Sequence, residues 1–222
     1  VTTTITYANS YTDPIVVASV RYDRGVGNGD QVAARVVNKT LTDFDIRTQD
    51  FNNDATGSTT IDYVVMEAGD YLIDDGGGTG VRVFASSTLV SSGAYQGANA
   101  GGAPGVGVDG NPGGPTITYP TEFSDPVAVA MVTTNNDPDW VVASVHSSND
   151  VDAPPSATEV QLFLNDNLFS DGHTQDEQVD VIVFDQGDGT NDGNAFNFTA
   201  SPDDSIDATP APIAINPNFS SA

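Results

Sequence analysis

The feature that most constrains the fold is an internal repeat. The stretch ITYANSYTDPIVVA at residues 5–18 returns as ITYPTEFSDPVAVA at residues 117–130, and seven of the fourteen positions are identical. The closing stretches also align, IDYVVMEAGD at 61–70 with VDVIVFDQGD at 179–188. A repeat of this length predicts two copies of one structural unit in tandem.

Each copy has the pattern of short β-strands, and neither shows a helical period. Proline has no N–H and fixes φ, so Asp13-Pro14 and Asp125-Pro126 predict a bend at which a new strand begins. After residue 70 the first copy continues into a hairpin-like piece at 71–84, where a glycine run supplies positive φ for a tight reversal. Apolar or alternating runs predict strands at 15–20, 31–37, 44–49, 61–66, 127–132, 140–145, 159–164 and 179–184.

We therefore expect an all-β protein built from two tandem antiparallel β-sandwiches of about six strands each. The first would occupy residues 1–100 and include the extra hairpin. The second would occupy residues 116–222 and end in an extended, proline-punctuated tail. The tract GGAPGVGVDGNPGGP at 101–115 has the composition of a flexible linker and would join them.

The charge of the chain restricts its partners. Its 222 residues include 31 acidic and 6 basic side chains, for a net charge of -25. Nucleic acid is excluded as a partner because phosphate binding needs a basic face. Two explanations of the acidity remain: a solvated surface suited to very high salt, which implies a halophilic source, or a set of calcium-binding loops.

The sequence also bears on location. No stretch approaches the about 18 consecutive apolar residues that a membrane helix needs, so membrane insertion is not expected. The chain begins at Val1 without a basic leader, which is the pattern of a processed secreted protein or of an excised piece. We expect a location outside the cell, or on the surface of a cell or virion.

The order of the elements resembles the H-type lectin family, and bacterial and archaeal repeats of that family most of all. The first copy matches over residues 5–67, including Ala34-Arg35-Val36 and the stretch 42–46, and the second matches more loosely over 117–186. Before the last strand the second copy carries Asp171-Gly-His-Thr174. The resemblance implies six-stranded sandwiches that assemble as trimers and bind galactose-type sugars at subunit boundaries.

Carried over by position, the sugar-contacting arginine of the family falls on Gln31 in the first copy and near Trp140 in the second. The Trp-His pair of the family falls on Phe51 and Asn52, and in the second copy on a loop that ends at His173. Because both copies lack the arginine, the sugar specificity of the family does not follow from the resemblance.

The residues themselves offer candidates for sugar binding, which needs an aromatic ring for stacking and planar polar groups for hydroxyls. Trp140, the only tryptophan, is the first candidate, and the alternative is a half-buried core residue. Gln31 is the candidate hydrogen-bonding partner, with a solvated strand end as the alternative. The further candidates lie in predicted loops, where they could equally be ordinary surface residues: Tyr22, Asp23, Arg24, Phe51, Asn52 and His173.

One loop has features of a calcium site. The stretch DQGDGTNDG at 185–193 places Asp185, Asp188 and Asp192 among glycines, but it lacks the terminal glutamate of an EF-hand loop. The alternative is an acidic turn. Calcium is the only cofactor that the sequence suggests.

Catalysis is not expected. The chain has two histidines and no cysteine, and it carries no HExxH, nucleophile-elbow or P-loop spacing. Three function classes remain. The first is a non-catalytic pair of glycan-binding modules, and the second is a structural β-sandwich protein of a virion surface, adhesin or filament that assembles with copies of itself. The third is a binding domain of a larger polysaccharide-active enzyme.

Overall fold

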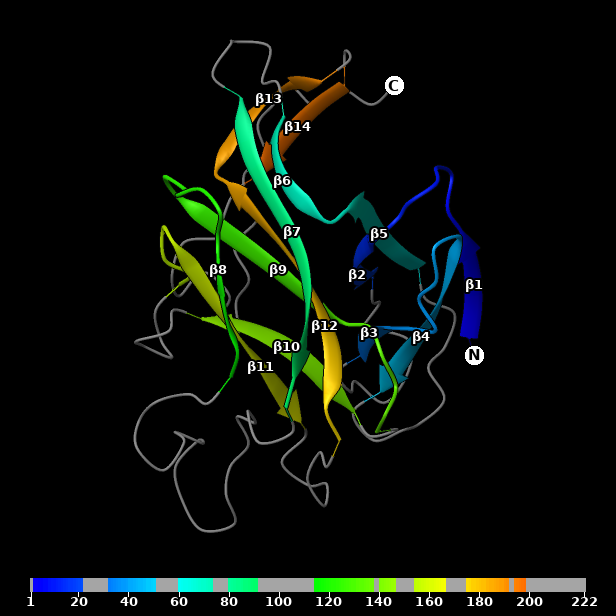
Figure 1. The fold of residues 1–222 in the computed structure, drawn as a ribbon. Helices are drawn as coiled ribbons and strands as arrows, with labels where there is room; N and C mark the ends of the chain where they lie inside the picture. Colours follow the sequence, from blue (N-terminus) through cyan, green and yellow to red (C-terminus); the bar gives the residue numbers. More distant parts are fainter. Residues whose placement is uncertain are drawn as a thin grey trace, which may run out of the picture.

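The fold is described from a computed structural model (Figure 1). The structure describes residues 2–21, 32–50, 60–73, 80–91, 114–137, 140–146, 154–166, 175–191 and 194–198. These ranges contain strands and turns and no helix, and all strand pairs are antiparallel, so the prediction of an all-β antiparallel protein is confirmed.

The described residues form seven strands in each half of the chain. Those of the first half are β1 (Thr2–Thr6), β2 (Pro14–Arg21), β3 (Val32–Val37), β4 (Asp43–Asp50), β5 (Thr60–Glu67), β6 (Gly69–Ile73) and β7 (Val81–Val90). Those of the second half are β8 (Thr116–Thr118), β9 (Pro126–Val132), β10 (Val141–His146), β11 (Glu159–Asp166), β12 (Glu177–Asp185), β13 (Gly187–Asn191) and β14 (Asn194–Phe198).

The two halves have the same strand order. The sheet β1-β4-β3 of the first half corresponds to β8-β11-β10 of the second, and the register agrees, with Ile5 opposite Phe44 and Ile117 opposite Val160. The pair β2-β5 corresponds to β9-β12, and the hairpin β6-β7 corresponds to β13-β14. The sequence repeat is therefore a repeat of topology.

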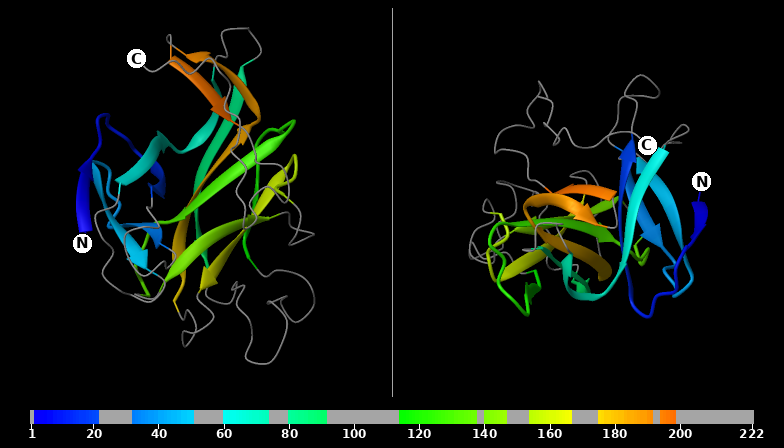
Figure 2. Two further views of the ribbon diagram at one scale, coloured as in Figure 1. Left: turned by 180° about the vertical axis from the view of Figure 1, so that it is seen from behind. Right: turned by 90° about the horizontal axis from the view of Figure 1, so that it is seen from above.

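The halves are not two separate sandwiches. Strand β7 of the first half pairs with β12 of the second, which gives one four-stranded sheet in the order β6-β7-β12-β9 (Figures 1 and 2). The expected division into sandwiches at 1–100 and 116–222 is thus not confirmed, because the expected extra hairpin at 71–84 belongs to the sheet of the second half. Of the expected linker at 101–115, residues 101–113 lie outside the described residues.

The shared sheet has a hydrophobic core on each face. On one face Phe84 of β7 packs with strands of the second half in a core that includes Leu162 and Val181. On the other face Val83 and Ile182 pack with β2 and β3 of the first half. Strand β7 suits a place inside this sheet because it carries buried apolar side chains on both faces, Val83 and Ala85 on one and Phe84 and Val90 on the other.

The Asp-Pro corners behave as the sequence predicts. Strand β2 begins at Pro14 and β9 begins at Pro126. In the first half the N–H groups of residues 12–13 donate to the carboxylate of Glu67 at 2.8 and 2.6 Å, and in the second the N–H groups of residues 124–125 donate to Asp185 at 2.7 and 3.0 Å. Each carboxylate thereby satisfies backbone donors that the bend leaves without a strand partner.

Directly after each of these carboxylates the chain bends and starts a hairpin. The hairpin of the first half begins at Gly69, whose φ of +151° is rarely adopted by residues with a side chain. A Cβ there would lie 2.8 Å from the hydroxyl oxygen of Tyr71. Gly80, at φ +71°, belongs to the glycine run for which the sequence predicts positive φ, while residues 74–79 lie outside the described residues.

Candidate functional site

Charged side chains of the first half bind carboxylates of β12, a strand of the shared sheet. Arg35 of β3 and Glu177 of β12 are both fully buried, and Nη2 of Arg35 donates to Oε1 of Glu177 at 2.6 Å. The Nε–H of Arg35 donates to the carbonyl oxygen of Thr134, and the Thr134 hydroxyl donates to the same glutamate. Burial lowers the pKa of Arg35, while the adjacent Glu177 carboxylate raises it. The sequence signal for this pair is an arginine inside the apolar strand VAARVV.

A second ion pair lies beside the first. Nζ of Lys39 donates to both carboxylate oxygens of Asp180 at 2.7 Å, and the aspartate also accepts bonds from Ser87 Oγ at 2.6 Å and from the Val16 N–H at 2.7 Å. Burial raises the pKa of Asp180, and the charge of Lys39 with these donors lowers it. Because donors come from β2, from β7 and from the turn after β3, this carboxylate connects both halves at one point.

A polar cleft of about 720 Å³, which Lys39 helps to line, lies between the β3–β4 turn and the segment after β9. Arg47 reaches across it and donates through Nη2 to Oδ1 of Asn135 at 2.6 Å. The cleft is lined by Thr2, Val37, Asn38, Lys39, Asp45, Arg47, Thr133, Thr134, Asn135, Asn136 and Gln178. Amides and hydroxyls suit a hydroxyl-rich ligand, but an aromatic platform for stacking is missing from this lining.

Trp140 does not line the cleft. It directly precedes β10 and is buried, with 8 % of the residue exposed. A ring this deeply buried has no open face for a sugar, which favours the core alternative. The other sugar candidates, Gln31, Phe51, Asn52, Tyr22, Asp23, Arg24 and His173, lie outside the described residues.

The calcium candidates are only partly described. Asp185 lies at the end of β12, where its Oδ1 accepts the two backbone N–H bonds of the corner, as Glu67 does in the first half. This role is structural and needs no ion. The side chain of Asp188 and all of Asp192 lie outside the description, and among the described residues no group of three or more metal-binding side chains occurs.

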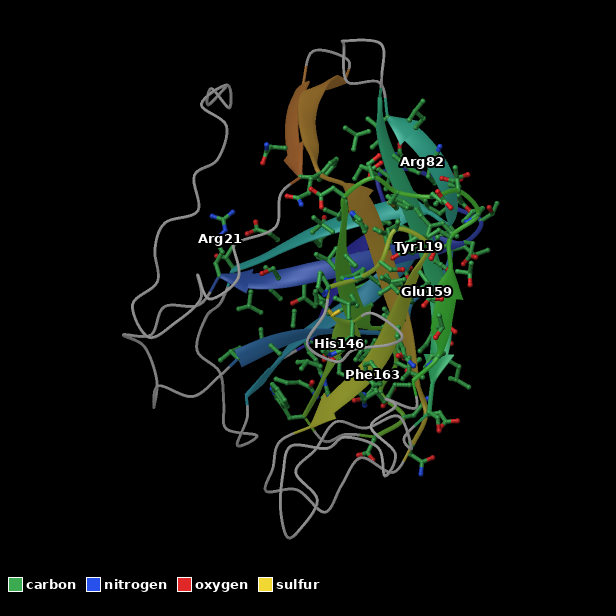
Figure 3. All side chains as sticks on the ribbon, turned by 90° about the vertical axis from the view of Figure 1, so that its left-hand side faces the viewer. Arg21, Arg82, Tyr119, His146, Glu159 and Phe163 are labelled. Carbon is green, nitrogen blue, oxygen red and sulfur yellow. The ribbon has the colours of Figure 1, made fainter. Side chains whose placement is uncertain are left out.

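His146, the histidine that the structure describes, packs against an aromatic ring. His146, at the end of β10, packs edge-on against Phe163 of β11 with 5.1 Å between ring centroids (Figure 3). That the chain is not an enzyme stays a prediction.

The second surface of interest is the edge of β5, on which sequence analysis placed no site. In the sheet of the second half, β12 is covered by β7, and Val181 and Ile182 are fully buried. At the equivalent positions of β5, Tyr63 is 47 % and Val64 is 50 % exposed. Among the described residues β5 pairs only with β2, whereas its counterpart β12 pairs with both β9 and β7, so β5 forms an edge of the described sheet.

An apolar groove of about 640 Å³ is lined by residues of β2, β5, β9 and β10. Val64 lies on one wall and Val129, also exposed, on the other, and Phe198 of β14 borders the groove. The ring of Phe198 stacks on Phe184 of β12, with 4.1 Å between centroids. Exposed apolar surface next to an unpaired strand edge is typical of a protein–protein contact.

At the far end of this sheet Arg21 and Asp62 form an exposed ion pair, at 2.6 Å, across the ends of β2 and β5 (Figure 3). Within the described ranges the structure contains no helix long and apolar enough to cross a bilayer.

Comparison with known proteins does not add a family to these observations. A scan against protein-family models, a search of curated proteins and a search of solved structures each found no match to this chain. The resemblance to H-type lectins therefore stays a prediction. The fold and the two surfaces define a class of protein only at the level of an acidic, all-β tandem repeat.

Proposed function

We propose that this protein is a non-catalytic structural component of an extracellular or surface assembly, and that it works through contacts between copies of itself. The observation that carries the proposal is the difference between equivalent strands. The second half is completed by a strand from the first, whereas β5 of the first half keeps an open edge with exposed Tyr63 and Val64. Within the chain, a strand of one unit extends the sheet of the other unit. The same kind of strand addition can take place between two chains.

The acidic surface agrees with this function in a saline environment. At a net charge of -25, copies repel one another at low ionic strength. At about 1 M salt the Debye length falls to about 3 Å, so that contacts between the apolar edges are no longer opposed by charges farther away. We therefore expect association to increase with salt.

Sedimentation velocity of the full chain over a series of salt and protein concentrations tests the proposal. We expect a monomer at low salt and larger species at about 1 M salt and above. A chain that stays monomeric under all these conditions would rule out self-assembly as its function. The trimer implied by the lectin resemblance is one specific size to be checked in the same experiment.

Glycan binding is the second candidate, and the polar cleft is the observation that favours it. Its amides and hydroxyls, with Arg47 and Asn135 in contact across the opening, provide donors and acceptors for a hydroxyl-rich ligand. A glycan array in high salt, probed with the natural chain and with Asn135→Ala, tests this function. Thr121→Ala, which changes an exposed residue outside the cleft, is the control. Signals that both variants retain equally would show binding elsewhere on the chain.

A further inference from the structure

The two hairpins occupy equivalent places but do not make equivalent contacts. Hairpin β6-β7 follows β5, hairpin β13-β14 follows β12, and the two start at the equivalent residues Gly69 and Gly187. Strand β7 uses its outer edge to pair with β12 over eight residue pairs, from Val83–Phe184 to Val90–Glu177. Strand β14 pairs with β13, and no other strand of the described chain pairs with it.

The edge of β5 presents the backbone groups that such a strand would need. The N–H of Ala68 donates to the carbonyl oxygen of Asp13 on the β2 side, and alternate residues of an antiparallel strand point to opposite sides. The backbone groups of Ile61, Tyr63 and Val65 therefore point away from β2. The Tyr11 hydroxyl reaches the Val65 oxygen at 3.4 Å, a weak bond that a strand could replace.

The side chains near this edge also lack the cover that their counterparts have. In the second half Tyr119 and Phe123 meet edge-on at 4.9 Å, Phe84 of β7 lies against Tyr119, and both rings of the pair are buried. In the first half the equivalent rings of Tyr7 and Tyr11 meet in the same way at 5.1 Å, but both are only half-buried. The difference between the pairs corresponds to the presence or absence of a third strand.

We propose that β14 of one copy of the protein pairs, antiparallel, with the free edge of β5 in a second copy. Each copy would then complete the first half of the next one, as β7 completes the second half within the chain. The contact is heterologous, since it joins two different surfaces, so its repetition gives a ring or an open filament. The proposal rests on the proposed function and specifies the surfaces that assemble.

The internal contact also predicts the register. Gly69 lies opposite Ala85 and Gly187 lies opposite Phe198, so Phe198 takes the place of Ala85. Ala85 pairs with Ile182, whose equivalent in the first half is Val64. Phe198 of one copy is therefore expected directly opposite Val64 of the next, where it would cover an apolar side chain that is exposed in the single chain.

Cysteine cross-linking tests this register, and the chain has no cysteine of its own. Val64→Cys and Phe198→Cys are introduced into separate chains, mixed at about 1 M salt and oxidised. Facing residues of an antiparallel pair lie close enough for a disulfide, so we expect a mixed dimer well above the level of either homodimer. The matched control replaces Val64→Cys by Tyr63→Cys, whose side chain points to the other face and which should give about tenfold less product.

A second variant tests the edge without cysteines. Tyr63→Lys places a charge on the free edge of β5, which opposes strand addition, and should weaken association at least about tenfold in sedimentation. Leu41→Lys adds the same positive charge at an exposed leucine in the β3–β4 turn and should leave association unchanged. Circular dichroism of both variants confirms that each remains folded.

The outcomes separate this inference from the proposed function. Mixed dimers in the expected register together with weakened assembly of Tyr63→Lys support strand addition. Assembly that neither responds to Tyr63→Lys nor yields the mixed dimer would overturn strand addition and leave the structural function standing. Absence of any assembly would overturn both. A chain carrying both cysteines that forms only an internal disulfide would show that β14 pairs within its own copy, and would also overturn the inference.

Discussion

Strands β5 and β12 are the same element of one repeat in two different surroundings. Both end at a carboxylate that holds an Asp-Pro corner, and both pair with the strand that begins at that corner. Strand β12 is covered on its second edge and buried on both faces, whereas β5 is open at its edge and exposes Tyr63 and Val64. Within the described residues only the second unit is completed by a further strand, and that strand, β7, comes from the first unit.

The largest effect should come from the charges that hold the halves together. Arg35→Met leaves Glu177 buried without its ion-pair partner, which should lower the free energy of unfolding by about 3–5 kcal/mol. Arg82→Met breaks the more exposed pair with Asp70 and should cost no more than about 1 kcal/mol. Denaturant unfolding of both variants measures the difference. Equal losses would mean that the buried pair does not set the arrangement of the halves.

A matched pair of truncations compares the two strands directly. Ile182→Ala creates a cavity in the core that β12 shares with β2 and β3 and should cost about 2–5 kcal/mol. Val64→Ala, at the equivalent position of β5, shortens a half-exposed side chain and should cost about 0.5 kcal/mol in the monomer. Both values come from unfolding at low salt, where assembly is opposed. If Val64→Ala proves as costly as Ile182→Ala, β5 is covered by a part of the chain outside the described residues.

Amide hydrogen exchange sharpens the same comparison at the level of single N–H groups. The N–H groups of Val181 and Val183 point toward β7 and should exchange only on global unfolding. Those of Tyr63 and Val65 point to the free edge and should exchange at least about 100-fold faster in the monomer. The experiment is repeated at high salt, where protection of the β5 amides should rise if a strand is added there. Slow exchange of Tyr63 at low salt would contradict an open edge.

The smallest effect concerns the corner of the first half. Bonds from the Thr12 hydroxyl and from the N–H groups of residues 12–13 lower the pKa of Glu67 below its ordinary value. Because the pKa in the folded state is depressed, the stabilisation is present above the ordinary value of about 4.3 and is lost as the pH falls through the folded pKa. Glu67→Gln should therefore melt earlier than the natural chain at neutral pH.

In this pH series the melting temperatures of Glu67→Gln and of the natural chain should become equal in acid. Glu122→Gln removes an equal charge from the exposed segment before β9 and is the control for net charge. A difference between Glu67→Gln and the natural chain that stays constant down to about pH 2 would contradict the assignment of the corner bonds to the ionised form of Glu67.

Much of the fold could be predicted from sequence because its causes are local. Pro14 and Pro126 mark the starts of β2 and β9, and the apolar runs give the larger strands. What the sequence could not predict is where β7 pairs, because the pattern VRVFASSTLV is compatible with a hairpin of the first half as well as with an edge of the second. Strand pairing between distant segments is a property of the whole fold, and a local pattern does not contain it.

The candidate site was harder to predict than the fold. Trp140 was singled out by its chemistry, but its position before an apolar strand places it in the core. The buried partners of Arg35 and Lys39, by contrast, lie about 140 residues away, and no spacing rule connects such positions. The open edge of β5 could not be predicted either, because it depends on β7 pairing with β12 and not with β5.

The distribution of the few cations has a consequence for how this molecule meets its solvent. Of the five basic side chains that the structure describes, three, Arg35, Lys39 and Arg47, reach from the first half into the second. Dissolved ions cannot approach the fully buried Arg35–Glu177 pair, whereas the acidic exterior is neutralised mainly by ions from outside. A change in the salt concentration of the medium should therefore alter the repulsion between copies, while the alignment of the two halves within each copy stays the same.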